Sequence, residues 1–417
     1  MEPLKRLHIP LITRLQSIVS VGVLVGVTLT VYGYKSASTP PLTSDEQRLG
    51  REAVPVATTG RDVSGRLLPL FFQSDVEVWR QPAAVYAAAG VAAVWPGVQW
   101  SVRIPSLLLA AVDIALLSCL AGTLRRHRWE GITAALLLML TPAHFVYGRV
   151  GLDAIYAVPC ALGWMLALGA YLWRPRPWLL VVATFSLGLG TLAQPAGPLI
   201  MSGLWACTVA ALWLEGHRTP GPYLLAGLGF GVPLACMAAW FMAHPETYPD
   251  TMGRWAIHAA HLRNPLDGWR ALTNRNTLGI RLSLFWDFFN PASLFFARDV
   301  PGAEATRGAA HLPAAFAVLV PLGVAAAWTH ERRSVVISLL GALIIPPLVA
   351  ATFGDTYATD RALVLVPFAA LLAAYGASSW IASPRAFRRA AAALLMLTVP
   401  AQFFFFWIAY LSPRPGL

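Results

Sequence analysis

Hydrophobic residues gather into long uninterrupted runs along this chain, and short charged clusters separate the runs. A helix needs about 20 apolar residues to cross a bilayer. By this measure the runs predict eleven spans, at 15–34, 103–123, 130–147, 152–173, 178–194, 197–214, 221–242, 312–329, 334–353, 362–380 and 390–411. We therefore expect an all-α integral membrane protein that forms one membrane domain over residues 1–417.

Composition supports this fold class and excludes another. Hydrophobic residues make up 57% of the chain and charged residues 12%, against about 25% charged residues in a typical soluble domain. The net charge of +11 is typical of many nucleic-acid-binding proteins, but here the basic residues lie in small clusters between apolar runs. The chain has neither zinc-finger spacing nor an RNA-binding signature. Nucleic acid is therefore not an expected partner.

The basic clusters also predict an orientation. Alternate short loops carry most of the arginines, and such loops face the cytoplasm in membrane proteins. This places the N-terminus inside and the C-terminus outside. Arg149 and Arg361 are exceptions, because they fall in short outer loops.

Two outer segments are long, at 35–102 and 243–311. Long loops of this kind are usually functional or disordered, and their Trp, Phe and Arg content argues against disorder. Within the first segment, 82–95 is apolar but too short for a span. We expect it to be a helix lying at the outer membrane interface.

Asp45 and Glu46 stand side by side in "TSDEQRLGRE", shortly after the first apolar run. One interpretation is structural, because Ser44 and Gln47 have the spacing of a helix-capping box and carboxylates stabilise the first turn of a helix. The other is catalytic, with a carboxylate acting as a general base near the membrane surface.

Several motifs in order favour the catalytic interpretation. After the Asp-Glu pair come "TTGRDVSGRLLPLFF" at 58–72, "WRQPAAVY" at 79–86, "RIPS" at 103–106, "YGRVGLD" at 147–153, "FFNPASLFFARD" at 288–299 and "DRALVLVPFAALLAAYG" at 360–376. This series resembles the GT-C superfamily of polyprenyl-phosphate-dependent glycosyltransferases, in the branch of protein O-mannosyltransferases and lipid A aminoarabinose transferases. The resemblance covers nearly the whole chain.

The resemblance implies a reaction and a base. The enzyme would move a sugar from a polyprenyl-phosphate carrier to an acceptor hydroxyl on the periplasmic side, with inversion at the anomeric carbon. Asp45 would be the general base, with Glu46 beside it. The leaving phosphate requires a cationic partner, and arginine matches its oxygens. The expected phosphate-binding residues are Arg361, Arg103, Arg149 and Arg80. For Arg361 and Arg103 the alternative is an interface anchor whose charged end reaches toward the headgroups.

Two further residues are expected to organise the donor or acceptor. They are Asp153, for which an ion pair with Arg149 at i,i+4 spacing is the alternative, and Tyr86. Gln81 departs from the aminoarabinose transferases, which have Lys at this point, and so argues against an aminoarabinose donor. Asp113 lies inside a span, where we expect a hydrogen bond between helices.

No cofactor is expected. His258 and His261 have a spacing that could seat a divalent metal, but no carboxylate pattern accompanies them. The expected partners are a polyprenyl-phosphate-linked sugar, a lipid, polysaccharide or protein acceptor, and membrane lipids. The expected location is a bacterial inner membrane, with the site facing the periplasm. A transporter or flippase of a lipid-linked sugar, and a non-catalytic scaffold of the same fold, remain as alternatives.

Overall fold

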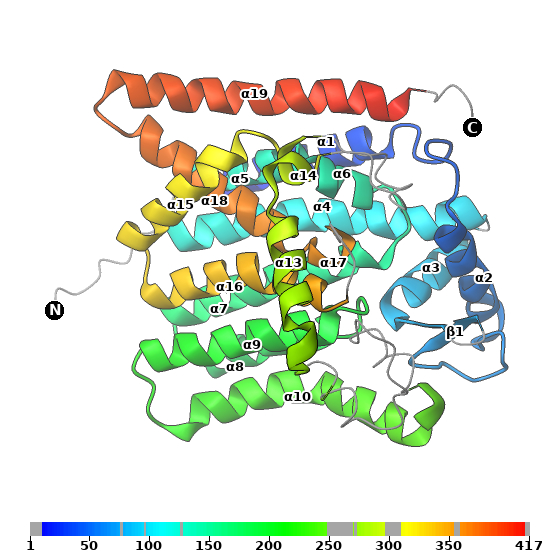
Figure 1. Ribbon diagram of the computed structural model, residues 1–417. Helices are drawn as coiled ribbons and strands as arrows, with labels where there is room; N and C mark the ends of the chain where they lie inside the picture. The colour runs from blue at the N-terminus through cyan, green and yellow to red at the C-terminus, as the bar shows by residue number, and fades with distance from the viewer. Residues whose placement is uncertain are drawn as a thin grey trace.

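The computed structural model describes residues 11–75, 78–95, 97–125, 128–247, 270, 273–296, 310–353 and 359–412. Within these ranges the chain is a bundle of long helices that run roughly side by side (Figure 1). Almost no sheet accompanies them there, since the described strands form one two-stranded hairpin. The expected all-α membrane fold is confirmed.

Each of the eleven expected spans contains a helix of the structure. These helices are α1 (Leu11–Gly33), α4 (Val98–Arg125), α5 (Arg128–Met139), α6 (Pro142–Tyr147), α7 (Ala157–Trp173), α8 (Pro177–Gly190), α9 (Gly197–Leu214), α10 (Pro220–Ala243), α15 (Phe316–His330), α16 (Arg333–Ala350), α18 (Leu365–Ile381) and α19 (Ala386–Leu411). In the described ranges, six helical stretches are long and apolar enough to cross a membrane, namely Val98–Leu124, Asp153–Trp173, Gly197–Leu214, Pro220–Ala243, Arg333–Phe353 and Ala386–Leu411. The other expected spans are shorter apolar helices.

Two of the differences from the expected boundaries bear on the residues discussed below. The helix α4 begins at Val98, ahead of the predicted start at 103, so Arg103 lies within its second turn. The predicted span at 130–147 is broken into α5 and α6. Pro142 explains the break, because proline has no N–H to continue the helical ladder and disfavours helical geometry in the residue before it.

The core of the bundle is built around α18, in which every residue from Leu365 to Ala377 is buried. A helix that is apolar on all sides belongs in the interior. It meets α15 at very close range, since a Cβ at Gly323 would lie 1.7 Å from the Leu372 carbonyl oxygen and one at Gly376 would lie 2.1 Å from that of Leu319. Small residues permit such close helix contacts in membranes.

The helices α10 and α19 lie at the edge of the bundle (Figure 1). Only 28% of the apolar stretch of α10 and 17% of that of α19 is buried inside the protein. Their remaining surface is apolar, which suits contact with lipid.

The long segment at 35–102, which the sequence predicts to lie outside, folds at one end of the bundle (Figure 1). It contains α2 (Ser44–Thr59), the antiparallel strands β1 (Phe72–Asp75) and β2 (Val78–Arg80), and α3 (Pro82–Val94). A helix therefore does occupy the region expected at 82–95, and it packs against α2 and α4.

The second long segment is described only in parts. These parts hold η2 (Pro245–Thr247), η3 (Arg275–Thr277), α13 (Leu278–Phe288) and α14 (Pro291–Phe295). Short elements between the membrane helices are η1 (Asp153–Tyr156), η4 (Ala351–Phe353) and α17 (Thr359–Ala362).

Candidate active site

The helix α2 carries the two neighbouring carboxylates in its first turn. Its N-cap is Thr43, whose hydroxyl oxygen accepts from the Glu46 N–H at 3.2 Å, while the Glu46 carboxylate accepts from the Thr43 N–H at 2.9 Å. This is a capping box. The expected box of Ser44 and Gln47 is thus wrong by one position, because Glu46 occupies the third helical position and makes Thr43 the cap.

Glu46 is completely buried and forms a bidentate ion pair with Arg103 of α4. Nε of Arg103 lies 2.6 Å from Oε1 of Glu46, and Nη2 lies 2.9 Å from Oε2. The backbone N–H of Gly151 also donates to Oε1, at 2.9 Å. One carboxylate therefore joins α2, α4 and the loop that follows α6.

Gly151 allows this loop to come so close. A Cβ at position 151 would lie 2.6 Å from the carbonyl oxygen of Val102 on α4. That distance is shorter than any ordinary contact, so a side chain would push the Gly151 N–H away from Glu46. The approach depends on glycine at this position.

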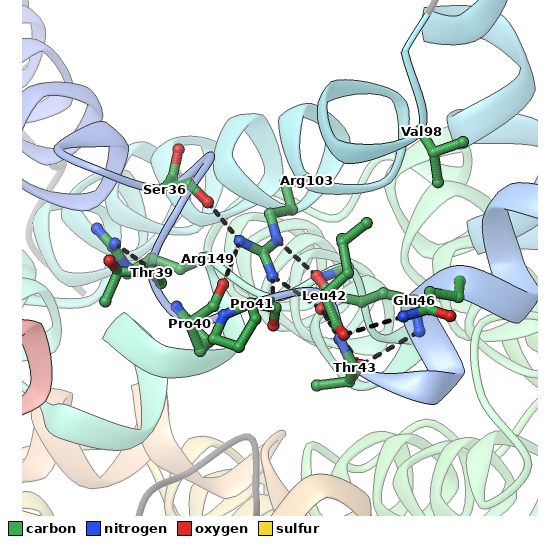
Figure 2. Close-up of polar contacts among 12 residues, drawn as sticks. Ser36, Thr39, Pro40, Pro41, Leu42, Thr43, Glu46, Val98, Arg103 and Arg149 are labelled. Atoms are coloured by element: carbon green, nitrogen blue, oxygen red, sulfur yellow. Dashed lines mark hydrogen bonds and ion pairs between the residues drawn. The ribbon is translucent and has the colours of Figure 1, made fainter. Parts of the chain in front are cut away.

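Arg103 and Arg149 both bind the connection between α1 and α2. Figure 2 shows Arg103 donating from Nη1 to the carbonyl oxygens of Ser36 and Pro40 and from Nη2 to that of Pro41. Arg149 donates to the carbonyl oxygens of Tyr32, Tyr34 and Thr39, and its guanidinium lies 5.0 Å from the ring centroid of Phe145. Both arginines are buried, so their donors hold the backbone that leads to Asp45.

Asp45 has the opposite environment to Glu46. Its side chain is 57% exposed, and its nearest ionic contact is Arg48, with 3.9 Å between Oδ1 and Nη1. An exposed pair at this distance contributes little energy. The first turn of a helix favours a negative charge, so the position suits a carboxylate that is open to a substrate.

The structure places Arg80 and Tyr86 in contacts within the segment at 35–102. Nε of Arg80 lies 3.1 Å from Oε2 of the buried Glu52 on α2. The Tyr86 hydroxyl donates to the Pro69 carbonyl oxygen at 2.8 Å. Burial, and secondarily the negative charge of Asp62, raise the pKa of Tyr86 above its usual value, which keeps this phenol a donor.

Asp153 begins η1, and Arg361 lies in α17, which contacts η1. The carboxylates of Asp153 and Asp360 are both within electrostatic range of the Tyr147 hydroxyl. Residues 149–152, which lead from Arg149 to Asp153, are not helical.

Arg361 itself is partly exposed. Its guanidinium lies 4.4 Å from the ring centroid of Phe353. The side-chain amide of the buried Gln194 donates to the Arg361 carbonyl oxygen at 3.4 Å.

These contacts join the segments that carry several sequence-distant candidates. Glu46 touches Gly151, so the segments that carry Asp45 and Asp153 are in contact, and η1 extends this contact to Arg361. Sequence reasoning did not identify four of the residues that build the arrangement, namely Thr43, Gly151, Gln194 and Asp360. The Asp-Arg pair in "DRALV" was the only available signal for the last of them.

The described part of the chain contains no evident metal-binding site. No group of three or more His, Cys, Asp or Glu side chains there could hold a metal ion. His258 and His261, the pair considered from the sequence, lie outside the described residues.

Comparisons with known proteins find similarity in structure but not in sequence. No family model matches the chain, and no curated protein sequence matches it either. The structure is similar to ArnT from Cupriavidus metallidurans bound to undecaprenyl phosphate, with a TM-score of 0.59 and 11% identity over 94% of this chain and 75% of that one.

Two structures of the Archaeoglobus fulgidus oligosaccharyltransferase AglB are also similar. The complex with an inhibitory peptide and a dolichol-phosphate has a TM-score of 0.57 and 13% identity, over 98% of this chain and 57% of that one. The complex with zinc and sulfate has a TM-score of 0.56 and 14% identity, over 95% of this chain and 53% of that one. The chain thus spans little more than half of AglB. The resemblance to the GT-C superfamily is confirmed at the level of the fold.

Proposed function

We propose that this chain, which has the fold of the GT-C transferases, moves a sugar from a polyprenyl-phosphate carrier to an acceptor hydroxyl, with Asp45 as the general base. The observation that carries the proposal is the exposed carboxylate of Asp45, held at the start of α2 by the buried pair of Glu46 and Arg103. Two of the similar structures contain a dolichol-phosphate and undecaprenyl phosphate. Those ligands support a lipid-phosphate donor here.

The chemistry requires one base. Asp45 would take the proton of the acceptor hydroxyl as its oxygen forms a bond to the anomeric carbon. The bond from that carbon to the phosphate oxygen breaks, and its electrons leave with the lipid phosphate. Phosphate has a second pKa of about 6, so it departs as an anion without a general acid. Attack opposite the phosphate inverts the anomeric centre.

Among the four arginines expected to bind phosphate, we propose Arg361 for this role. Arg103 and Arg149 are buried and donate to backbone carbonyl oxygens, and Arg80 is paired with Glu52. Arg361 is partly exposed and lies beside η1, which starts at Asp153. Asp153 would then orient the sugar or the acceptor.

Glu46 and Arg103 take a different role in this proposal from the one the sequence suggested. Both are positioning residues, because each is enclosed by protein and neither faces solvent. A transporter would need polar groups in mid-membrane. Asp113, the acidic residue at that depth, is bonded to His144 and gives this alternative no support. We place the reaction at the outer face of a bacterial inner membrane.

The test uses purified protein in detergent and a panel of radiolabelled prenyl-phosphate sugars, with a membrane extract as the source of acceptor. We expect one donor to lose its label to the acceptor fraction. Asp45→Asn should abolish that transfer, whereas Arg48→Ala, which removes an exposed neighbour of Asp45, should retain it. Undiminished transfer by the Asp45→Asn protein would overturn the assignment of the base.

A further inference from the structure

Three polar side chains that contact one another are completely buried inside the helical bundle, apart from the candidate active site. They are Tyr32 of α1, Asp113 of α4 and His144 of α6. The Tyr32 hydroxyl lies 2.9 Å from Nδ1 of His144, and Nε2 of His144 lies 3.4 Å from Oδ2 of Asp113. The three side chains form a continuous hydrogen-bonded chain across three helices.

The hydrogen atoms in this chain follow from one further contact. The Tyr32 hydroxyl donates to the Met139 carbonyl oxygen at 2.8 Å. A hydroxyl has a single hydrogen, so toward His144 the Tyr32 oxygen must accept. Nδ1 of His144 therefore carries a hydrogen. One more proton then lies between Nε2 and Oδ2, and it belongs either to Asp113 or to an imidazolium.

The second carboxyl oxygen of Asp113 favours the neutral form. Within the described ranges Oδ1 is buried and has no hydrogen-bond partner. A carboxylate would place an uncompensated charged oxygen in the membrane interior, which costs far more than an unpaired carbonyl oxygen. A protonated carboxyl group keeps the charge at zero and supplies the hydrogen that Nε2 needs.

The chain of hydrogen bonds ends next to the segments that hold Asp45. The backbone carbonyl oxygen of Tyr32 accepts a hydrogen bond from Arg149. A Cβ at Gly148 would lie 3.0 Å from Cδ2 of Tyr32, so the ring packs directly on the end of α6. Arg149 thus joins Tyr32 to the α1–α2 connection, and the Tyr32 ring packs against the loop that donates to Glu46.

We propose that Asp113 is a neutral carboxylic acid that donates its proton to His144, and that Asp113, His144 and Tyr32 position the α1–α2 connection and the 148–151 loop around Asp45. The second half of this statement rests on the proposed function; the first half does not. The residues are positioning residues, since none of them faces the substrate.

Infrared spectroscopy tests the protonation state without any activity. The difference spectrum between wild type and Asp113→Asn, recorded at neutral pH, should contain the carbonyl band of a protonated carboxylic acid, and this band should shift in D₂O. A difference spectrum that instead shows the two bands of a carboxylate would overturn the neutral assignment.

Hydrogen exchange and kinetics test the positioning. Tyr32→Phe keeps the ring but removes the oxygen that accepts from Nδ1, so exchange of the amides in 34–39 and 148–151 should become faster. Asp113→Asn keeps a donor toward Nε2 and should leave that exchange unchanged. Unchanged exchange in Tyr32→Phe would overturn the positioning role.

If transfer is detected in the wild type, its kcat should fall by about 100-fold in Tyr32→Phe, because a small displacement of a reacting group has such an effect. The donor KM and the pH profile should stay near their wild-type values, and Asp113→Asn should retain most of the rate. A fully active Tyr32→Phe protein counts against the proposal. If the wild type transfers no sugar, the proposed function fails, while the spectroscopic and exchange results still decide this inference.

Discussion

Asp45 and Glu46 are neighbours in the chain, yet the side chain of Asp45 is 57% exposed and that of Glu46 is completely buried against Arg103. The first turn of α2 turns the two carboxylates to different sides. One is open to a substrate, and the other fixes the helix that carries it. The predictions below separate these two roles.

Asp45→Asn should reduce sugar transfer by about 100-fold or more, the usual contribution of a general base, and leave the thermal unfolding temperature unchanged. Glu46→Gln should lower the thermal unfolding temperature, because it leaves Arg103 buried without its counter-charge. Transfer assays and thermal unfolding in detergent measure the two effects. A large loss of stability in Asp45→Asn would contradict the division of roles.

Arg103→Met should destabilise the fold by about 3–5 kcal/mol, the cost of leaving a buried charge unpaired. The double variant Glu46→Gln with Arg103→Met should recover part of that loss. Arg48→Met is the matched control, because its pair with Asp45 is exposed and 3.9 Å long and should contribute about 0–1 kcal/mol. Equal unfolding temperatures for Arg103→Met and the control would argue against the buried pair as a structural element.

Arg361→Ala should raise the donor KM by roughly 10- to 100-fold, since a hydrogen bond to a charged group contributes about 1.5–3 kcal/mol. Arg218→Ala is the control, because Arg218 also stacks on an aromatic ring, that of Trp213 at 4.8 Å, but lies in a loop on the other side of the expected membrane. A variant that alters only protein yield would identify Arg361 as an anchor.

Gly151→Ala should destabilise the protein by about 1–3 kcal/mol, as overpacked positions do, because its Cβ would lie 2.6 Å from the Val102 carbonyl oxygen. Transfer should fall as well, since the loop would move from Glu46. Gly90→Ala provides the comparison, as a Cβ there meets nothing within 4 Å. Thermal unfolding measures both variants. Similar unfolding temperatures for the two would show that the loop accommodates the added Cβ without strain.

The buried His311 should make the stability of the fold depend on pH. Burial lowers the pKa of His311 from 6.5 to about 4, so the unfolded chain binds a proton in this pH window and the folded chain does not. Stability should therefore fall as the pH drops from about 6.5 toward 4. His311→Gln should show a weaker decline over the same range. Parallel declines of the two unfolding temperatures would exclude His311 as the cause.

The membrane helices were predictable from the sequence because lipid imposes a simple requirement. A segment that crosses it must be apolar and about 20 residues long, and charges must lie at its ends. The break before Pro142 was not anticipated, although proline at that position explains it. The span at 130–147 was predicted from its apolar composition, which a single proline hardly changes.

The candidate site was predictable only in part. The pair of Asp45 and Glu46 was identified, but its division into an exposed and a buried carboxylate was not, because the partner of Glu46 comes from α4, far along the chain. Arg103 and Arg149 were expected to bind phosphate. Their acceptors are backbone carbonyl oxygens of the α1–α2 connection, and every residue has such an oxygen, so no sequence pattern signals this role.

The separation of Asp45 from Glu46 also affects how descendants of this chain could diverge. The bond network of Glu46, Arg103 and Gly151 does not include the Asp45 side chain. Replacement of Asp45 would thus change the stability of the fold little, whereas replacement of Glu46 would lower it substantially. A homologue that had given up catalysis and kept its shape should retain Glu46 and Arg103 while position 45 drifts, so the residue at position 45 would reveal the loss before any other part of the sequence did.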